Sequence, residues 1–195
     1  GNIEYSQGIF RRKDDFSNSI TLQKLSTYII SNAVEVIGYG FVSELELAPA
    51  SAGHVVDIEI DTDTGKVNIL NYTSFQDVGL TLNPDMVEGQ MQGGAVQGIG
   101  WALSEEYIYD SNGVMKNPTL LDYRIPTALD VPMLMCDILN VPAKSGPYGV
   151  RGAGEMGIVL PPACIANAIS RVLMVRPYRL PMNPERVFWL NRCKK

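Results

Sequence analysis

Residues 54–75, HVVDIEIDTDTGKVNILNYTSF, carry the clearest local signal in the chain. Polar and apolar residues alternate from His54 to Ile60, and the alternation resumes from Val67 to Phe75. The intervening residues 61–65, DTDTG, are typical of a tight turn. Alternation on both sides of a short turn predicts an antiparallel hairpin.

A long helix is expected after this hairpin. Asn83-Pro84-Asp85 has the pattern of an N-cap followed by Pro at the first helical position. Each Gly in a helix interior costs about 1 kcal/mol relative to Ala, and the expected helix contains Gly89, Gly93, Gly94, Gly98 and Gly100. Gly89, Gly93 and Gly100 are spaced to lie near one face, which could receive another backbone or a flat ligand.

Two glutamines of the same segment, Gln90 and Gln97, are seven residues apart and project from a common side. Each amide offers hydrogen-bond donors and acceptors together. Two interpretations stay open. The segment is either a tightly packed helix with two polar edge residues, or a helix that binds a polar heterocycle.

Elsewhere strands and helices are interspersed, and the length suits one domain, or one domain and a piece of another. We expect a strand at 2–12, a helix at 19–36 ended by Gly38 and Gly40, a second hairpin turn at 110–113, an irregular segment at 117–132, a strand at 134–141, a helix at 163–175 and a short capped helix at 183–189. This order predicts an α+β fold, with a mixed or antiparallel sheet packed against several helices.

Composition excludes several classes of protein. The chain is 46% hydrophobic and 19% charged, so it can bury a core. Its net charge is −5, and its only basic blocks are Arg11–Lys13 and Lys194-Lys195, which argues against a nucleic-acid surface. We count no apolar run of the roughly 18 residues that span a membrane, and therefore expect no membrane contact.

Metal and nucleophile sites are also disfavoured. The cysteines, Cys136, Cys164 and Cys193, are too few and too far apart for a disulfide framework, a zinc site or an iron–sulfur cluster. His54 is the only histidine and reads as part of a strand, so we interpret it as structural rather than as a triad member. We therefore expect no metal site made of protein ligands.

Residues 150–157, VRGAGEMG, place one carboxylate, Glu155, within a run of three glycines. Glu155 is either a helix-start carboxylate stabilised by the macrodipole or a side chain aimed at a ligand. The run also spells G-x-G-x-x-G. We reject a dinucleotide site, because no strand precedes the run and no acid follows about 20 residues later.

Four motifs occur in an order that resembles the xanthine dehydrogenase/aldehyde oxidase family. They are Asn83-Pro84, GQMQGGAVQGIG at 89–100, LDYRIP at 121–126 with DVP at 130–132, and GAGE at 152–155. The match is to the C-terminal part of the molybdopterin-binding large subunit, and it is closest from about residue 50 to 175. The resemblance implies that residues 1–195 are a single C-terminal fragment of the molybdenum cofactor-binding domain.

The resemblance also implies an activity, the oxidation of an aldehyde or N-heterocycle with oxygen derived from water. Glu155 corresponds to the family's base at Mo–OH, and Gln90 to a glutamine beside the cofactor. The other expected cofactor-binding residues are Gly89, Gly93, Gln97, Gly152, Ala153 and Gly154. Molybdenum is held by the pterin dithiolene and not by side chains, and the pterin is present with or without a cytosine dinucleotide.

The implied partners are the N-terminal part of the large subunit, and iron–sulfur clusters and FAD on other domains or subunits. We expect a cytoplasmic location. The isolated fragment should be inactive, and its uncovered apolar face should favour self-association as a homo-oligomer. The alternative is a non-catalytic module for cofactor binding or assembly.

Overall fold

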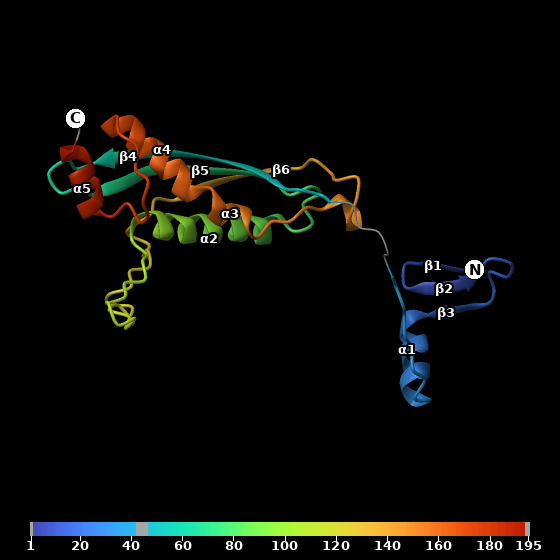
Figure 1. Cartoon of the computed structure of the whole chain (residues 1–195). Coiled ribbons are helices and arrows are strands. Elements are labelled where there is room, and N and C mark those ends of the chain that lie inside the picture. The colour runs from blue at the N-terminus through green and yellow to red at the C-terminus, as the bar shows by residue number, and fades with distance from the viewer. Residues whose placement is uncertain (1, 42–46, 194–195) are drawn as a thin grey trace. The chain divides into compact units, whose positions relative to one another are not determined.

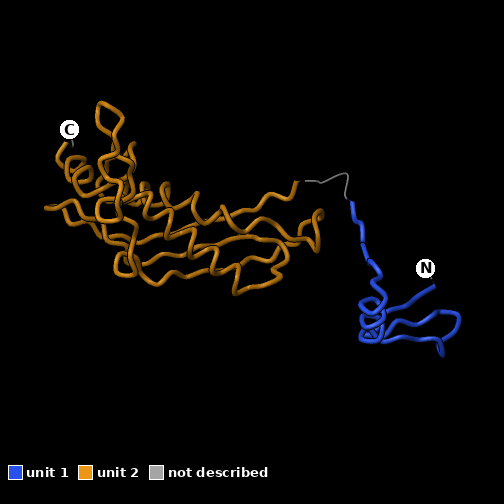
Figure 2. Tube along the Cα trace, turned by 90° about the horizontal axis from the view of Figure 1, so that it is seen from below, with its two compact units in different colours: residues 1–44 blue, residues 45–195 orange. Residues whose placement is uncertain are grey.

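A computed structural model describes residues 2–41 and 47–193, and the chain divides into two units (Figure 2). Unit 1 comprises residues 1–44, and unit 2 comprises residues 45–195. Unit 1 contains a three-stranded antiparallel sheet and a helix. Its elements are β1 (Ile3–Ser6), β2 (Ile9–Arg12), β3 (Ser19–Thr21) and α1 (Leu22–Ser31).

The boundaries expected in unit 1 are wrong at three places. Residues 19–21, expected to begin a helix, form strand β3, which pairs with β2. Gln7 and Gly8 have φ of 48° and 78°, which turns the chain back, so residues 2–12 form a hairpin and not one strand. The helix expected to reach Val36 ends at Ser31, because Ala33 has φ of 48° and leaves the helical conformation. Asn32 caps this end by donating its side-chain N–H to the Tyr28 carbonyl at 2.8 Å.

In unit 2 the hairpin expected at residues 54–75 is confirmed. Strand β4 (Ser51–Ile60) pairs antiparallel with β5 (Val67–Asp77). The Asp61 carboxylate holds the turn by accepting the backbone N–H of Asp63 at 2.9 Å. Strand β6 (Leu134–Leu139) adds to β5 in parallel. The sheet is therefore mixed, and the α+β prediction is confirmed.

Helices accompany this sheet, and Figure 1 shows the longest, α2, running alongside it with α3 and α4 adjacent. They are α2 (Pro84–Leu103), the 3-10 turn η1 (Pro147–Gly149), α3 (Met156–Val159), α4 (Pro161–Leu173) and α5 (Pro184–Arg192). The predicted start of α2 is confirmed, because the Asn83 side chain accepts the Met86 N–H at 3.2 Å. The same kind of cap starts α5, where Asn183 accepts the Arg186 N–H at 3.0 Å.

The core of unit 2 lies between the sheet and its helices. Strand β5 contributes Tyr72, α2 contributes Ile99, and α4 contributes Ile165 and Ile169, all of them buried. Each of these buried side chains contributes about 1.5–3 kcal/mol to the stability of the fold, relative to leaving it exposed. The core thereby fixes α2 and α4 against the sheet, and α3 lies in the connection that leads into α4.

Residues 104–132 contain no strand or helix. The turn at Asp110–Gly113 is present. The residues on its two sides are joined by a single β-bridge, between Tyr109 and Met115, and do not form the strands of a hairpin. Residues 117–132 are irregular, as predicted. Arg186 of α5 donates to both Glu106 carboxylate oxygens, at 2.7 and 2.9 Å, and ties this segment to α5.

One expectation about apolar runs is wrong. Met156–Leu173 spans 18 residues with a mean hydropathy of 1.5, which is long and apolar enough to cross a membrane. In unit 2 this stretch is divided between α3 and α4, with Leu160 at the junction. The buried face of α4 packs against the core through Pro161, Ile165, Ile169 and Leu173.

Candidate functional site

Glu155 lies directly before α3, and its carboxylate makes no capping hydrogen bond to that helix. The side chain is exposed. Helix α3 has only four residues, so its dipole gives a carboxylate little stabilisation. A group that neither caps nor packs is available to meet a ligand, which favours the second of the two interpretations of Glu155.

The start of α3 is held against α2 at very short range. A Cβ atom added at Gly157 would lie 3.1 Å from the Met91 carbonyl oxygen and 3.1 Å from the Gly94 Cα. One turn further along α2, a Cβ at Gly98 would lie 2.8 Å from the Ile158 carbonyl oxygen. A side chain at Gly98 would force the two elements apart, and one at Gly157 would require its neighbours to shift by a few tenths of an ångström. The position of Glu155 therefore depends on the α2 glycines.

The glycines that receive another backbone are not the ones expected. Gly94 and Gly98, four residues apart, form the contact with α3, whereas Gly89 and Gly93 have no atom within 4 Å of an added Cβ. Gly100 packs against the Glu105 side chain and Pro126. The five glycines therefore serve three different neighbourhoods, and Gly89 and Gly93 leave an open strip on α2.

Gln90 is the expected glutamine that reaches the Glu155 loop. A Cβ at Gly154 would have the Gln90 Oε1 as its neighbour, at 3.8 Å. Gln97 is seven residues further along α2, roughly 10 Å along the axis, and is also exposed. Its neighbour Gly98 packs on Pro161. The loop thus meets α2 at Gln90 and not at Gln97.

Three residues that were not predicted hold the loop before Glu155. Gln76 of β5 is fully buried, and its Nε2 donates to the Ala153 carbonyl at 3.0 Å. Asp77 pairs with Arg151, with the Arg151 Nε 3.2 Å from the Asp77 Oδ2. No local pattern marks these residues, because 74 positions separate Asp77 from Arg151 (151 − 77). The sequence offered one sign of their role, which is that the polar residues Gln76 and Asp77 directly follow the strand expected at residues 67–75.

His54 belongs to a polar cluster inside unit 2. Its Nδ1 lies 2.6 Å from the Tyr72 hydroxyl, and its Nε2 lies 2.9 Å from the Ser74 Oγ. Ser74 is fully buried, and no carboxylate is among the partners that His54 has in the described part of the chain. Burial lowers the pKa of His54 to about 4 and raises the pKa of the Tyr72 hydroxyl. The cluster joins β4 to β5, in agreement with a structural role.

This cluster predicts a pH dependence of stability. The pKa of His54 is about 4 in the fold, against 6.5 for the free side chain, so the unfolded chain binds the proton more readily between these values. The contribution of neutral His54 is fully present above pH 6.5 and is lost as the pH falls toward 4. Thermal unfolding should show a lower midpoint at pH 5 than at pH 7. In His54→Gln that difference should shrink, and an unchanged difference would exclude His54 as its source.

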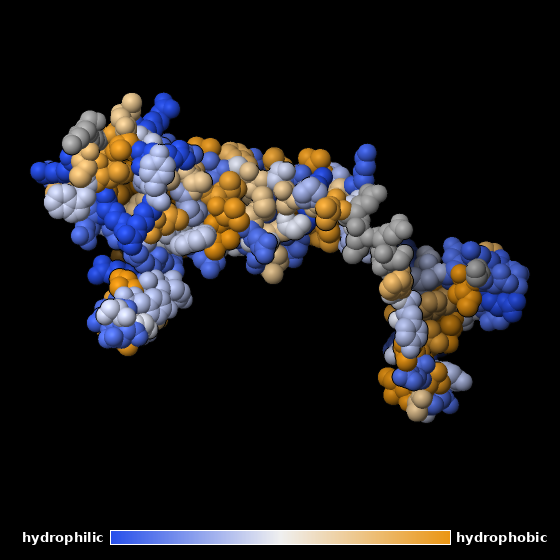
Figure 3. Space-filling model, viewed as in Figure 1, coloured by the Kyte–Doolittle hydropathy of each residue, from blue (hydrophilic) through white to orange (hydrophobic). Residues whose placement is uncertain are grey.

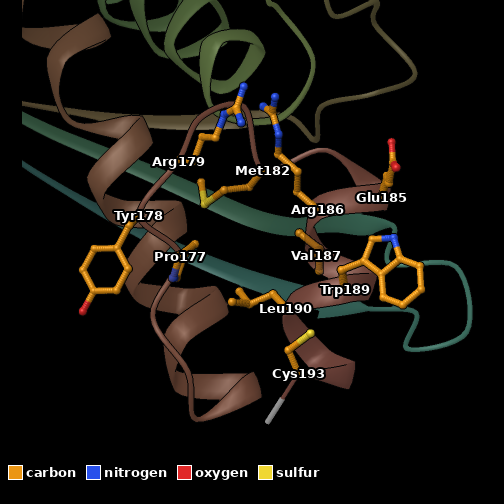
Figure 4. Close-up of a pocket in the computed structure, with 10 residues that line it drawn as sticks. All are labelled: Pro177, Tyr178, Arg179, Met182, Glu185, Arg186, Val187, Trp189, Leu190 and Cys193. Carbon is orange, nitrogen blue, oxygen red and sulfur yellow. The ribbon is translucent and has the colours of Figure 1, made fainter.

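The cavities of unit 2 lie elsewhere. A cavity of about 440 Å³ is lined by α5 and residues 177–182, with Tyr178, Arg186 and Trp189 at its walls (Figure 4). A second, of about 430 Å³, includes residues of the LDYRIP and DVP motifs. Neither contains Glu155 or Gln90. Residues 2–41 and 47–193 also contain no group of three or more His, Cys, Asp or Glu side chains that could hold a metal ion.

Comparison with known proteins gives consistent matches. Residues 1–132 match the family model of the molybdopterin cofactor-binding domain. The chain is 38% identical over 143 residues to subunit gamma of the 6-hydroxypseudooxynicotine dehydrogenase complex of Paenarthrobacter nicotinovorans, covering 72% of this chain and 18% of the relative. It is 39% identical over 141 residues to a putative xanthine dehydrogenase molybdenum-binding subunit of Escherichia coli, covering 72% of this chain and 19% of the relative.

Solved structures give the same result over a longer range. The crystal structure of quinoline 2-oxidoreductase from Pseudomonas putida 86 covers 100% of this chain with a TM-score of 0.80 and 30% identity. This chain covers 26% of that chain. The chain thus spans less than a third of the length of the proteins that it matches.

Proposed function

The chain belongs to the xanthine dehydrogenase/aldehyde oxidase family of molybdenum hydroxylases, and we propose that it is the C-terminal part of such an enzyme's large subunit. In the complete enzyme it takes part in oxidising an aldehyde or an N-heterocycle, with Glu155 as general base. The observation that carries the proposal is the approach of the Gly154–Glu155 loop to Gln90 at an open strip of α2.

The residues at this strip fit a flat, polar cofactor. Gly89, Gly93 and Gly152 have no atom within 4 Å of an added Cβ, so a ring could approach the backbone closely. The Gln90 amide offers a donor and an acceptor, and the loop Gly152–Glu155 offers backbone N–H donors. Molybdopterin would be held by Gln90, Gly89, Gly93, Gly152, Ala153 and Gly154. Gln97 would contact it from further along α2.

These positions assign separate roles to the cofactor, Glu155 and Gln90. When bound, the molybdenum cofactor supplies the oxygen transfer and the two-electron oxidation. Glu155 accepts a proton from the attacking oxygen, which requires an ionised carboxylate within hydrogen-bond reach. Gln90 orients the bound ring from the side of α2, and the loop that leads into Glu155 passes Gln90 at Gly154.

Exposed apolar side chains on unit 1 indicate that another part of the enzyme covers this surface. None of the described residues of unit 1 is buried, and Figure 3 shows apolar residues at its surface. Ile3 and Phe16 are each 64% exposed, and Ile30 is 77% exposed. Apolar surface of this kind marks an interaction site. Unit 1 therefore packs against another part of the enzyme, which we propose is the N-terminal part of the large subunit.

We propose that electrons leave through iron–sulfur clusters and FAD carried on other domains or subunits, and that the complete enzyme is cytoplasmic. The name of the Paenarthrobacter relative, a subunit of a dehydrogenase complex, supports such an assembly. A non-catalytic module for cofactor binding or assembly is the alternative, and it would bind the same partners without turnover.

The proposal predicts that cofactor binding requires assembly. The chain purified alone should contain no molybdenum and oxidise no substrate, because a site shared between segments loses its preorganisation when one is absent. Copurified with the rest of the large subunit, it should bring down molybdenum, measured by elemental mass spectrometry, together with hydroxylase activity. Stoichiometric molybdenum in the isolated chain would contradict the shared site. Molybdenum without turnover in the complete assembly would favour the non-catalytic module.

A further inference from the structure

We propose that Gln76 and the Asp77–Arg151 ion pair are positioning residues, which hold the loop 151–154 so that Glu155 faces the cofactor side of α2. This inference rests on the proposed role of Glu155 as base. Gln76 and Asp77 bind the loop, of which Arg151 is the first residue, and they act through Glu155. The end of strand β5 thereby becomes part of the active-site machinery.

Gln76 is an unusual residue for a core position. It is 0% exposed, and its Nε2 bonds to the carbonyl of Ala153, two residues before Glu155. No group in the described residues donates a hydrogen bond to its Oε1. A buried acceptor without a partner opposes folding. Because one of its two polar side-chain atoms is unpaired among the described residues, Gln76 contributes little to the stability of the fold. Its single hydrogen bond goes to the loop before Glu155.

The Asp77–Arg151 pair grips the same loop and ties it to two other segments. The Arg151 and Asp77 side chains are only 17% and 13% exposed. Arg151 also donates from Nη1 to the Pro49 carbonyl at 2.7 Å and from Nε to the Val141 carbonyl at 3.3 Å. Asp77 accepts the backbone N–H of Gly79 at 2.9 Å and that of Val141 at 3.2 Å through Oδ1. The guanidinium presents its donors on separate nitrogens in a fixed plane, here Nε and Nη1, whereas a lysine presents all its donors from a single nitrogen.

The geometry explains why two anchors are present. Gln76 and Asp77 are consecutive in β5, so their side chains leave opposite faces of the sheet. One face holds the loop at Ala153 and the other at Arg151, and the Arg151 N–H also donates to the Val78 carbonyl at 2.7 Å. Gly152 lies between the two anchored residues, and Gly154 lies between Ala153 and Glu155. Because glycines restrict the backbone little by themselves, the anchors act together with the α2–α3 contact to place Glu155.

The test is Gln76→Met in the complete enzyme. Met matches the length of Gln and fills the same space, but it cannot hold the Ala153 carbonyl. We expect unchanged molybdenum content and an unchanged or higher melting temperature, because the unpartnered Oε1 is removed with the amide. Backbone amides of Gly152–Glu155 should exchange hydrogen faster. The limiting rate of substrate-dependent reduction should fall about 10- to 100-fold, as expected for a misplaced base, with KM changed less than about two-fold.

Controls separate positioning from general damage. Gln92→Met makes the same change on α2, where the Gln92 amide has only Glu88 of its own helix as a partner among the described residues, and it should leave rate and exchange unchanged. Arg151→Lys keeps the charge beside Asp77 but cannot reach Pro49 and Val141 together, so the rate should fall about 10-fold. This second variant also tests the inference if Gln76→Met does not assemble.

The outcomes distinguish this inference from the proposed function. Parent-like rates and exchange in both Gln76→Met and Arg151→Lys, alongside a strong loss in Glu155→Gln, would overturn the positioning role and leave Glu155 as base. Parent-like rates in Glu155→Gln would overturn the proposed function itself. A lower melting temperature of Gln76→Met together with a lower rate, and with unchanged hydrogen exchange at Gly152–Glu155, would make Gln76 a structural residue only.

Discussion

Replacing Glu155 by Gln in the complete enzyme is expected to slow substrate oxidation by about 10²- to 10⁴-fold, the usual contribution of a positioned general base. The amide keeps the shape of the side chain but cannot take up the proton. Because the Glu155 carboxylate is exposed and makes no capping bond to α3, the fold and the molybdenum content should stay unchanged. The loss should therefore appear in the limiting rate of reduction by substrate.

The measurement is rapid-mixing reduction of the complete enzyme by its own substrate. Glu185→Gln is the matched control, since Glu185 is an exposed carboxylate in the first turn of α5. If both variants react at the parent rate, Glu155 is a helix-start carboxylate like Glu185, and the base lies elsewhere. A loss confined to Glu155→Gln would support its chemical role.

Features of the fold that depend on neighbouring residues could be predicted from the sequence. The hairpin of β4 and β5 follows from alternation and from the turn after Asp61, and the start of α2 follows from Asn83 and Pro84. The parallel pairing of β6 with β5 could not be predicted, because its partners, such as Tyr72 and Leu134, are far apart in sequence. The hairpin at Gln7 was missed because a polar residue at positive φ has only a weak sequence signal.

The candidate site shows the same division. Glu155 and Gln90 were predicted through motifs of the family, and the structure brings the Gln90 side chain to the residue before Glu155. Gln76 and Arg151 were missed, because a single Gln in a strand and a single Arg in a loop read as ordinary surface residues. Their role depends on distances across the fold. Helical spacing alone also could not decide which α2 glycines face α3.

Replacing Gly98 by Val is expected to destabilise unit 2 by about 1–3 kcal/mol, the usual cost of overpacking a tight contact. A Cβ at Gly98 would lie 2.6 Å from the Pro161 Cγ and 2.8 Å from the Ile158 carbonyl oxygen. Neither neighbour is the end of a flexible side chain, so α2 and the α3–α4 junction must separate. Thermal and urea unfolding of the chain should both show the loss.

Gly93→Ala is the matched control, because Gly93 belongs to the same helix but has no atom within 4 Å of an added Cβ. This change should stabilise the chain by roughly 0.5–1 kcal/mol, since Ala is the better helix residue. The two substitutions should therefore have opposite signs in one helix. If Gly98→Val were as stable as Gly93→Ala, the α2–α3 contact would be compliant. The glycines of α2 could not then be what holds Glu155 opposite Gln90, and the anchors at the end of β5 would have to place it alone.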